Sequence, residues 1–151
     1  EAHMVDVSAK QETIRTAIAL AQVQLTEPVL KALINDALPK GDLYATVRIA
    51  AIQGAKKCSD LIPLCHPLPL HRITVDIELD TDTQRLMILV FCKTTGKTGV
   101  EMEALTGATI GALTAYDMCK GIDKGVVIGE VRLLEKTGGK SGDWKARDFS
   151  S

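Results

Sequence analysis

The sequence is poor in aromatic residues and has almost no net charge. Its 151 residues include two Phe, two Tyr and one Trp, and the formal net charge is −1. A charge this close to zero excludes the broad basic surface typical of nucleic-acid-binding domains. A sheet that binds RNA also needs aromatic side chains on its strands, and the expected strands supply only Phe91. We therefore expect no nucleic acid partner.

Long apolar runs and paired cysteines are also missing. No segment has the length of a membrane span, and we find no pattern of a secretory signal peptide. We expect no membrane partner. The four cysteines, Cys58, Cys65, Cys92 and Cys119, contain no CxxC pair, which argues against a disulfide framework. These features predict a cytoplasmic protein.

The length fits a single domain, residues 1–151, that buries roughly two thirds of its unfolded surface. Strands are expected where apolar residues alternate or run together, although the alanines of the first segment keep a helix possible there. These segments are Glu12–Leu25, Ile73–Leu79, Arg85–Lys93 and Val126–Glu135. The polar turn 80–84 joins the middle two into a hairpin. Residues 138–151 are expected to form a mobile tail that can meet a ligand.

Three helices are expected between these strands. Thr26 and Pro28 predict the start of a short one, and Asp42 predicts the cap of a second that ends before Pro63. Thr98 and Glu101 have the spacing of a capping box. The third helix would bury one apolar face and end at Gly121 and Gly125; the face comprises Met102, Leu105, Thr109, Ala112, Leu113, Tyr116 and Cys119. This order is a split βαβ unit, which predicts an α+β ferredoxin-like sandwich with an extra helix and an antiparallel sheet.

Asp117 and Lys120 are the most informative polar pair in this frame. They are three residues apart at the end of the third helix, so they share a helix face and can pass protons. Taken alone, such a pair is more often a surface ion pair. His66 lies between Pro63 and Pro67, which restrict its loop and suit it to binding or proton transfer as well as to an ordinary structural role.

Other polar residues are less specific when each is taken alone. Glu101 has a role as a helix-cap partner, whereas Glu103 does not share it. Arg15, Lys40 and Lys136 are each typical of a solvated surface. Their scatter along a small domain predicts a site shared between subunits.

Two groups of residues suggest a phosphate-binding loop and a zinc site, but neither has the spacing that such a site requires. Gly96-Lys97-Thr98 and Gly139-Lys140-Ser141 lack the glycine that a phosphate-binding P-loop has five residues before its Gly-Lys, although 138–142 could still bind an anion. The zinc-type residues Cys58, Cys65, His66 and His71 lack the paired short spacing of structural zinc sites. We expect no metal and no cofactor, and keep zinc as the alternative.

Five segments closely resemble the cyclic pyranopterin monophosphate synthase family, the C protein of molybdenum cofactor biosynthesis. They contain MVDVSAK, LIPLCHPL, KTGVEMEALT, ALTAYDMCK and KTGGKSGDW, and the likeness covers nearly the whole chain. The resemblance implies a ferredoxin-like, cytoplasmic homo-hexamer, a trimer of dimers. It implies a lyase that converts the cyclic dihydroguanosine triphosphate made by a radical SAM enzyme into cyclic pyranopterin monophosphate and pyrophosphate.

The resemblance also implies roles for individual residues. Asp117 and Lys120 would be the catalytic pair, with cations that hold the triphosphate and lower the pKa of Lys120. The substrate would be bound by Leu64, Cys65, His66, Glu101, Met102, Glu103, Arg15, Lys40 and Lys136. A ligand-binding regulatory module with the same fold would bind a small molecule without turnover, and the fold alone does not exclude it.

Overall fold

The computed structural model describes residues 1–149, and Ser150 and Ser151, the end of the expected tail, lie outside the described residues. The strands and helices follow one another along the chain in a fixed order. They are β1 (Thr13–Gln24), α1 (Glu27–Ile34), α2 (Leu43–Lys56), α3 (Cys58–Leu61), β2 (Arg72–Asp80), β3 (Arg85–Gly96), α4 (Glu101–Cys119), β4 (Val127–Thr137) and β5 (Trp144–Lys145).

The strands form one antiparallel sheet in the order β2-β3-β1-β4-β5. The first four strands, with α2 between β1 and β2 and α4 between β3 and β4, form the split βαβ unit, so the predicted ferredoxin-like fold is confirmed. The first expected strand is β1, and α1 is the expected extra helix. The hairpin of β2 and β3 is also present, although β3 runs three residues further than expected, to Gly96.

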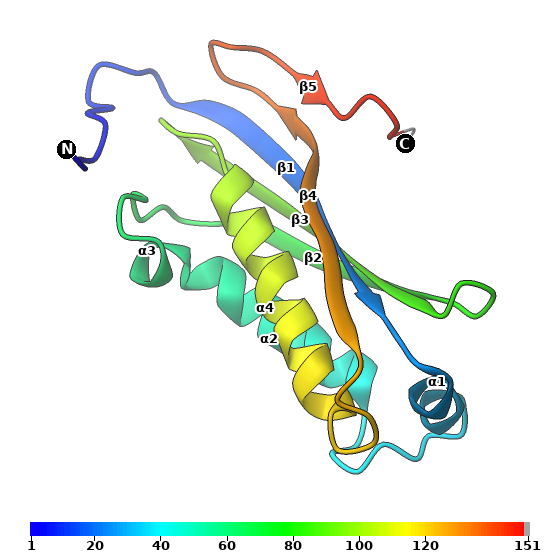
Figure 1. Cartoon of the computed structure of the whole chain (residues 1–151). Helices are drawn as coiled ribbons and strands as arrows, with labels where there is room; N and C mark the ends of the chain where they lie inside the picture. The colour runs from blue at the N-terminus through cyan, green and yellow to red at the C-terminus, as the bar shows by residue number, and fades with distance from the viewer. Residues whose placement is uncertain (150–151) are drawn as a thin grey trace.

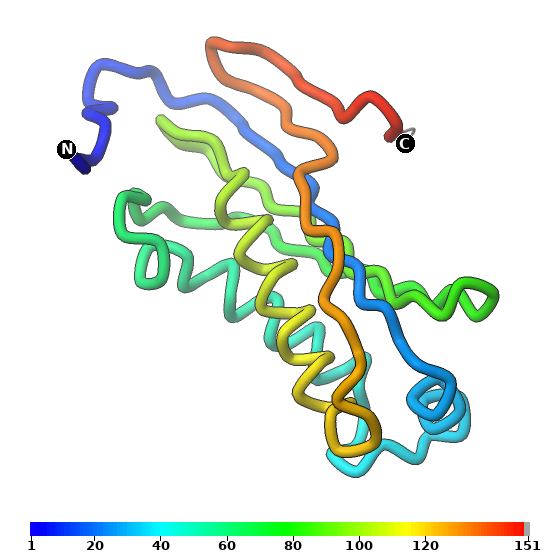
Figure 2. Tube along the Cα trace, viewed as in Figure 1, coloured from blue at the N-terminus to red at the C-terminus, as the bar shows by residue number. Residues whose placement is uncertain are grey.

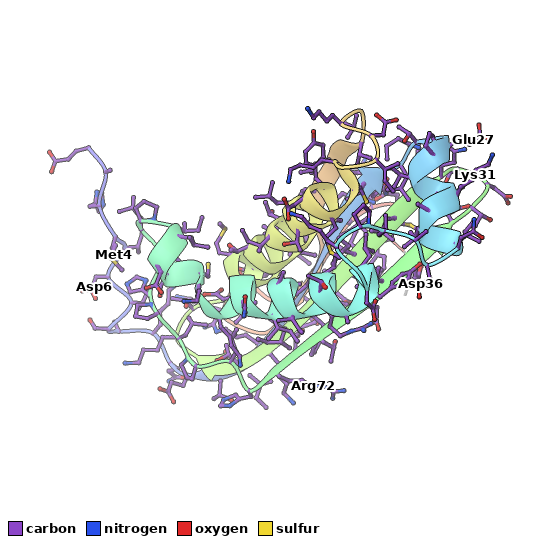
Figure 3. All side chains as sticks on the ribbon, turned by 90° about the horizontal axis from the view of Figure 1, so that it is seen from below. Met4, Asp6, Glu27, Lys31, Asp36 and Arg72 are labelled. Carbon is purple, nitrogen blue, oxygen red and sulfur yellow. The ribbon has the colours of Figure 1, made fainter. Side chains whose placement is uncertain are left out.

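Helices α2 and α4 lie side by side on one face of the sheet (Figure 1), and the view turned by 90° shows the two layers (Figure 3). Small residues bring these layers together. Alternate β1 residues Ala17, Ala19 and Ala21 are fully buried. A Cβ added to Gly107 of α4 would lie 2.9 Å from the backbone oxygen of Ala51 in α2. The close approach of the two helices therefore requires glycine at that position.

The face predicted for the third helix is partly confirmed: Ala112 and Cys119 are buried, and Leu105 and Tyr116 pack against the core. Its other three members are exposed. Leu113 is 54% exposed and Met102 is 40% exposed, and Thr109 is exposed too. The buried face is made mainly of smaller residues; it includes Ala104, Thr106, Gly107, Ala108, Gly111, Ala112, Ala115, Met118 and Cys119. The prediction followed the large apolar side chains, whereas close packing against α2 and the sheet selects small ones.

The two helix starts have different outcomes. Asp42 caps α2 as predicted, because its carboxylate accepts a hydrogen bond from the backbone N–H of Ala45 at 3.1 Å. The capping box of Thr98 and Glu101 is wrong. Helix α4 begins at Glu101 itself, and the preceding residue, Val100, is fully buried. Burial of Val100 in the core fixes this helix end in place of a side-chain cap.

Two segments differ from expectation at the ends of elements. The expected second helix is broken after Lys56, and α3 follows as a separate short turn. The expected mobile tail is partly ordered. Trp144 and Lys145 pair with β4, the Ala146 N–H donates to the Leu134 carbonyl at 2.7 Å, and Arg132 pairs with Asp148. Among residues 1–149, no helix combines the length and apolarity needed to cross a membrane.

Candidate active site

One polar cluster lies at the C-terminal end of α4. The Asp117 carboxylate accepts a hydrogen bond from Lys120 Nζ, as the i, i+3 spacing predicts, and another from Lys40 Nζ at 2.7 Å. Lys40 lies in the connection between α1 and α2, just before Asp42, which caps the start of α2. All three side chains are about half exposed. The structure therefore joins two predicted catalytic residues and one predicted binding residue in one accessible cluster.

The electrostatics of this cluster favour the ionised forms. Hydrogen bonds from Lys120 and Lys40 lower the pKa of Asp117 to about 2. The hydrogen bond to Asp117 raises the pKa of Lys120. The single chain therefore does not show the lowered Lys120 pKa that we expected, because the hydrogen bond and charge of the Asp117 carboxylate outweigh the effect of desolvation. The cluster places the Asp117 carboxylate between two lysine side chains.

A second cluster lies at the other end of α4. Glu103 is 4% exposed, and its Oε2 accepts a weak hydrogen bond from the Cys65 thiol at 3.7 Å. Its Oε1 has no hydrogen-bond partner among the described residues. Burial raises the pKa of Glu103, and the nearby Glu101 carboxylate raises it further. A buried carboxylate with an unpartnered oxygen is costly, and such groups are frequent at functional sites.

The residues beside Glu103 come from the loop between α3 and β2 and from the first turn of α4. Leu64 and Met102 are 48% and 40% exposed, and His66 is half-buried. Apolar side chains of this size that remain exposed beside polar groups are suited to contact a flat organic ligand. The predicted substrate-binding residues of this loop and helix turn therefore lie at the same end of the molecule.

Arg15 and Lys136 also lie toward this end, on β1 and β4. Arg15 is 7% exposed, and its guanidinium donates to the carbonyls of Gly96 at 3.0 Å and Lys97 at 3.2 Å. Lys136 Nζ donates to Ser141 Oγ at 2.9 Å. Gly139, with φ of +85°, packs against the guanidinium, since an added Cβ would lie 2.3 Å from Arg15 Nη1.

A cavity of about 850 Å³ opens beside Arg15. Its lining comes from the N-terminal segment, the start of β1 and the connection that follows β4. Figure 2 shows the N-terminal segment and this connection at the same end of the molecule. Lys10, Lys140 and Ser141 line it together with Arg15. Its cations and the hydroxyl suit an anionic ligand. The sequence indicated an anion-binding role for 138–142, but no such role was predicted for Lys10.

The predicted site residues thus fall into two groups. Helix α4 is 19 residues long, so its ends are roughly 27 Å apart at 1.5 Å per residue. Asp117 and Lys120 lie at its C-terminal end, where Lys40 joins them, and Figure 1 shows this end of α4 near α1. The other predicted residues lie toward the opposite end. In Figure 3, the same two ends are marked by Met4 and Asp6, beside α3, and by Glu27 and Lys31 of α1. One chain does not bring the two groups together.

A known family model covers most of the chain. Residues 4–139 match the model of the MoaC family. The chain belongs to the MoaC family. It is therefore an enzyme of molybdenum cofactor biosynthesis. The resemblance found in the sequence is confirmed, and the match to the MoaC family includes both clusters at the ends of α4.

Sequence reasoning did not find every contact in the second cluster, the one around Glu103. Cys58 Sγ lies 3.6 Å from Cys65 Sγ and accepts a hydrogen bond from the Thr106 hydroxyl at 3.4 Å. Cys58 and Cys65 are seven residues apart, and Glu103 is a further 38 residues along the chain. No regular spacing connects the three side chains, so only the folded structure shows that they meet.

Proposed function

We propose that this protein is a cyclic pyranopterin monophosphate synthase. It would convert cyclic dihydroguanosine triphosphate, 3′,8-cyclo-7,8-dihydro-GTP, into cyclic pyranopterin monophosphate and release pyrophosphate. The observation that carries the proposal is the contact of Asp117 with both Lys120 and Lys40 at an accessible helix end. Such a cluster supplies a proton donor, a proton acceptor and positive charge at one place, as the reaction requires.

Lys120 and Asp117 act on protons in this proposal. Rebuilding a pterin ring from a purine-derived one requires proton transfers at nitrogen and carbon. The raised pKa of Lys120 keeps it protonated in the free enzyme, so Lys120 begins the reaction as a general acid. Asp117, with its pKa near 2, is ionised and orients the ammonium group.

The phosphate step makes use of the other cations. A ribose hydroxyl oxygen forms a bond to the innermost phosphorus, the bond from that phosphorus to the pyrophosphate oxygen breaks, and the hydroxyl proton passes to a base. Negative charge develops on the pyrophosphate, which Arg15, Lys40 and Lys136 stabilise. Glu101 and Glu103 face the purine-derived ring, and Leu64, Cys65, His66 and Met102 line its pocket.

We further propose that each active site is completed by two subunits. The length of α4 keeps the Asp117 cluster roughly 27 Å from the Glu101 end within one chain. A neighbouring subunit that presents its Glu101 end to the Asp117 cluster brings the two groups together. Cations of that neighbour then lie near Lys120 and lower its pKa, opposing the effect of Asp117.

The assembly proposed is a homo-hexamer built as a trimer of dimers. The sheet face opposite α2 and α4 supports self-association, because Ile14 is 60% exposed and Ile18 and Phe91 are partly exposed beside a cavity on that face. The proposed enzyme works in the cytoplasm, without a cofactor of its own. A radical SAM enzyme acting upstream supplies its substrate.

A turnover assay tests the proposed function. The purified protein is mixed with 3′,8-cyclo-7,8-dihydro-GTP, and cyclic pyranopterin monophosphate is measured by mass spectrometry alongside released pyrophosphate. We expect one pyrophosphate per product, with both lost in Lys120→Ala. Binding of the substrate by the wild-type protein without turnover would contradict the proposal and favour a regulatory module.

A further inference from the structure

We propose that Cys58, Cys65 and Glu103 form a binding site for a thiophilic divalent cation such as Zn²⁺. This inference goes beyond the proposed function, which uses no metal, and does not depend on it, although both use Cys65 and Glu103. Two sulfur atoms and one carboxylate oxygen from these residues all lie within 4.8 Å of one another. Cys58 and Glu103 are buried, and Cys65 is partly exposed, so an ion can enter from the side of Cys65.

The distances between the donor atoms match the coordination geometry of zinc. Tetrahedral zinc holds sulfur at about 2.3 Å and carboxylate oxygen at about 2.0–2.2 Å, which places donor atoms roughly 3.5–3.8 Å from one another. The two sulfur atoms are 3.6 Å apart, and Cys65 Sγ lies 3.7 Å from Glu103 Oε2. Two of the three donor pairs therefore already have the required separation. The third pair, Cys58 Sγ and the Glu103 carboxylate, lies within 4.8 Å.

The surroundings of the three donors favour a cation. The Glu103 carboxylate is buried with one oxygen unpartnered among the described residues, and Glu101 adds charge of the same sign. A bound cation would supply the missing partner and the opposite charge. The Thr106 hydroxyl donates to Cys58 Sγ at 3.4 Å, as an outer-shell hydrogen bond to a metal-bound thiolate does. Three protein ligands leave a fourth position for water.

Binding couples to protons and to stability. Burial raises the pKa of both thiols, that of Cys65 to about 12, so each thiol must release its proton as the metal binds. We therefore expect affinity to rise with pH. Because the three donors come from α3, the following loop and α4, a bound ion also links these segments. It should raise the unfolding temperature by mass action.

Cobalt provides the direct test, because Co²⁺ in a tetrahedral thiolate site absorbs visibly and shows a sulfur-to-cobalt charge-transfer band. The full-length protein, with its thiols confirmed as reduced by titration, is titrated with Co²⁺, and Zn²⁺ is then added to displace it. We expect one Co²⁺ per chain, with both absorption features lost when Zn²⁺ is added. Wild-type protein with reduced thiols that shows no charge-transfer band would overturn the proposal.

Variants separate this site from other thiols, with cobalt binding as the readout. Cys58→Ser should weaken cobalt binding by more than about 100-fold, since even outer-shell changes cost 10–100-fold. Glu103→Gln, which keeps the side-chain shape, should also weaken it and serves if Cys58→Ser does not fold. Cys119→Ala is the matched control, because Cys119 is a buried thiol at the far end of α4. An unchanged spectrum in both site variants, or its loss in Cys119→Ala, would contradict the assignment.

Discussion

Replacement of Gly139 by alanine should damage the anion pocket by displacing Arg15. Gly139 and Gly142 both have positive φ, +85° and +76°, so an alanine at either position costs about 1–2 kcal/mol for its left-handed backbone. Their surroundings differ. An alanine Cβ at Gly139 would lie 2.3 Å from Arg15 Nη1, whereas at Gly142 nothing lies within 4 Å. Gly142→Ala is therefore the matched control.

The additional cost in Gly139→Ala comes from the hydrogen bonds that Arg15 makes to Gly96 and Lys97. Hydrogen bonds to charged groups contribute about 1.5–3 kcal/mol each. Loss of one, or partial loss of both, makes Gly139→Ala about 1.5–3 kcal/mol less stable than Gly142→Ala. At about 2–4 °C per kcal/mol for a chain of this size, its unfolding temperature should be roughly 3–12 °C lower than that of the control.

Thermal unfolding followed by circular dichroism measures this difference, and equilibrium binding measures the affinity for the triphosphate substrate. We expect Gly139→Ala to show both the lower unfolding temperature and weaker binding than Gly142→Ala. Equal unfolding temperatures and equal affinities in the two variants would refute the packing of Gly139 on Arg15 as a determinant of the pocket.

Three further predictions concern the charged residues. Asp117→Asn and Lys120→Ala should each lower turnover at least on the order of 100-fold, the scale of a general acid or base. Fold and assembly should stay intact, because both side chains are half exposed. Near-normal turnover in either variant would remove the catalytic assignment. In Asp117→Asn the pKa of Lys120 should fall, because the hydrogen bond that raises it is lost. The alkaline limb of the residual pH–rate profile should therefore move to lower pH. An unmoved limb would argue against Lys120 as the acid. Arg15→Ala, Lys40→Ala and Lys136→Ala should each weaken substrate binding, and wild-type affinity should fall as salt rises; an affinity insensitive to salt and to all three changes would make these cations an ordinary solvated surface.

The parts of the fold that the sequence predicted are those with strong local signals. The alternation in β2, the polar turn before β3 and the Asp42 cap are each properties of a few neighbouring residues, and all three are present. The buried face of α4 was not predictable in this way. It depends on how closely α2 approaches, and Gly107 and Ala51 show that this contact selects small residues.

In the candidate site, too, only the contact between neighbouring residues was predictable from the sequence. Asp117 and Lys120 are three residues apart, so helix periodicity was enough to predict their contact. Lys40 joins them from 77 residues away, and only family resemblance had linked it to the site. The contact between Cys58, Cys65 and Glu103 also joins distant segments. No local pattern in the sequence carries such a juxtaposition, because tertiary packing creates it.

Complementation between two inactive variants tests most directly whether two subunits build each active site. His66→Ala and Lys120→Ala proteins, each inactive alone, are mixed after dissociation and reassembled, with exchange confirmed by native mass spectrometry. If His66 and Lys120 reach one pocket from different chains, a mixed pair has one intact site and one doubly altered site. Random exchange makes about half of the pairs mixed, so activity should recover to roughly a quarter of wild type. A mixture that exchanges its subunits but remains inactive would contradict the shared site and assign both residues to one chain.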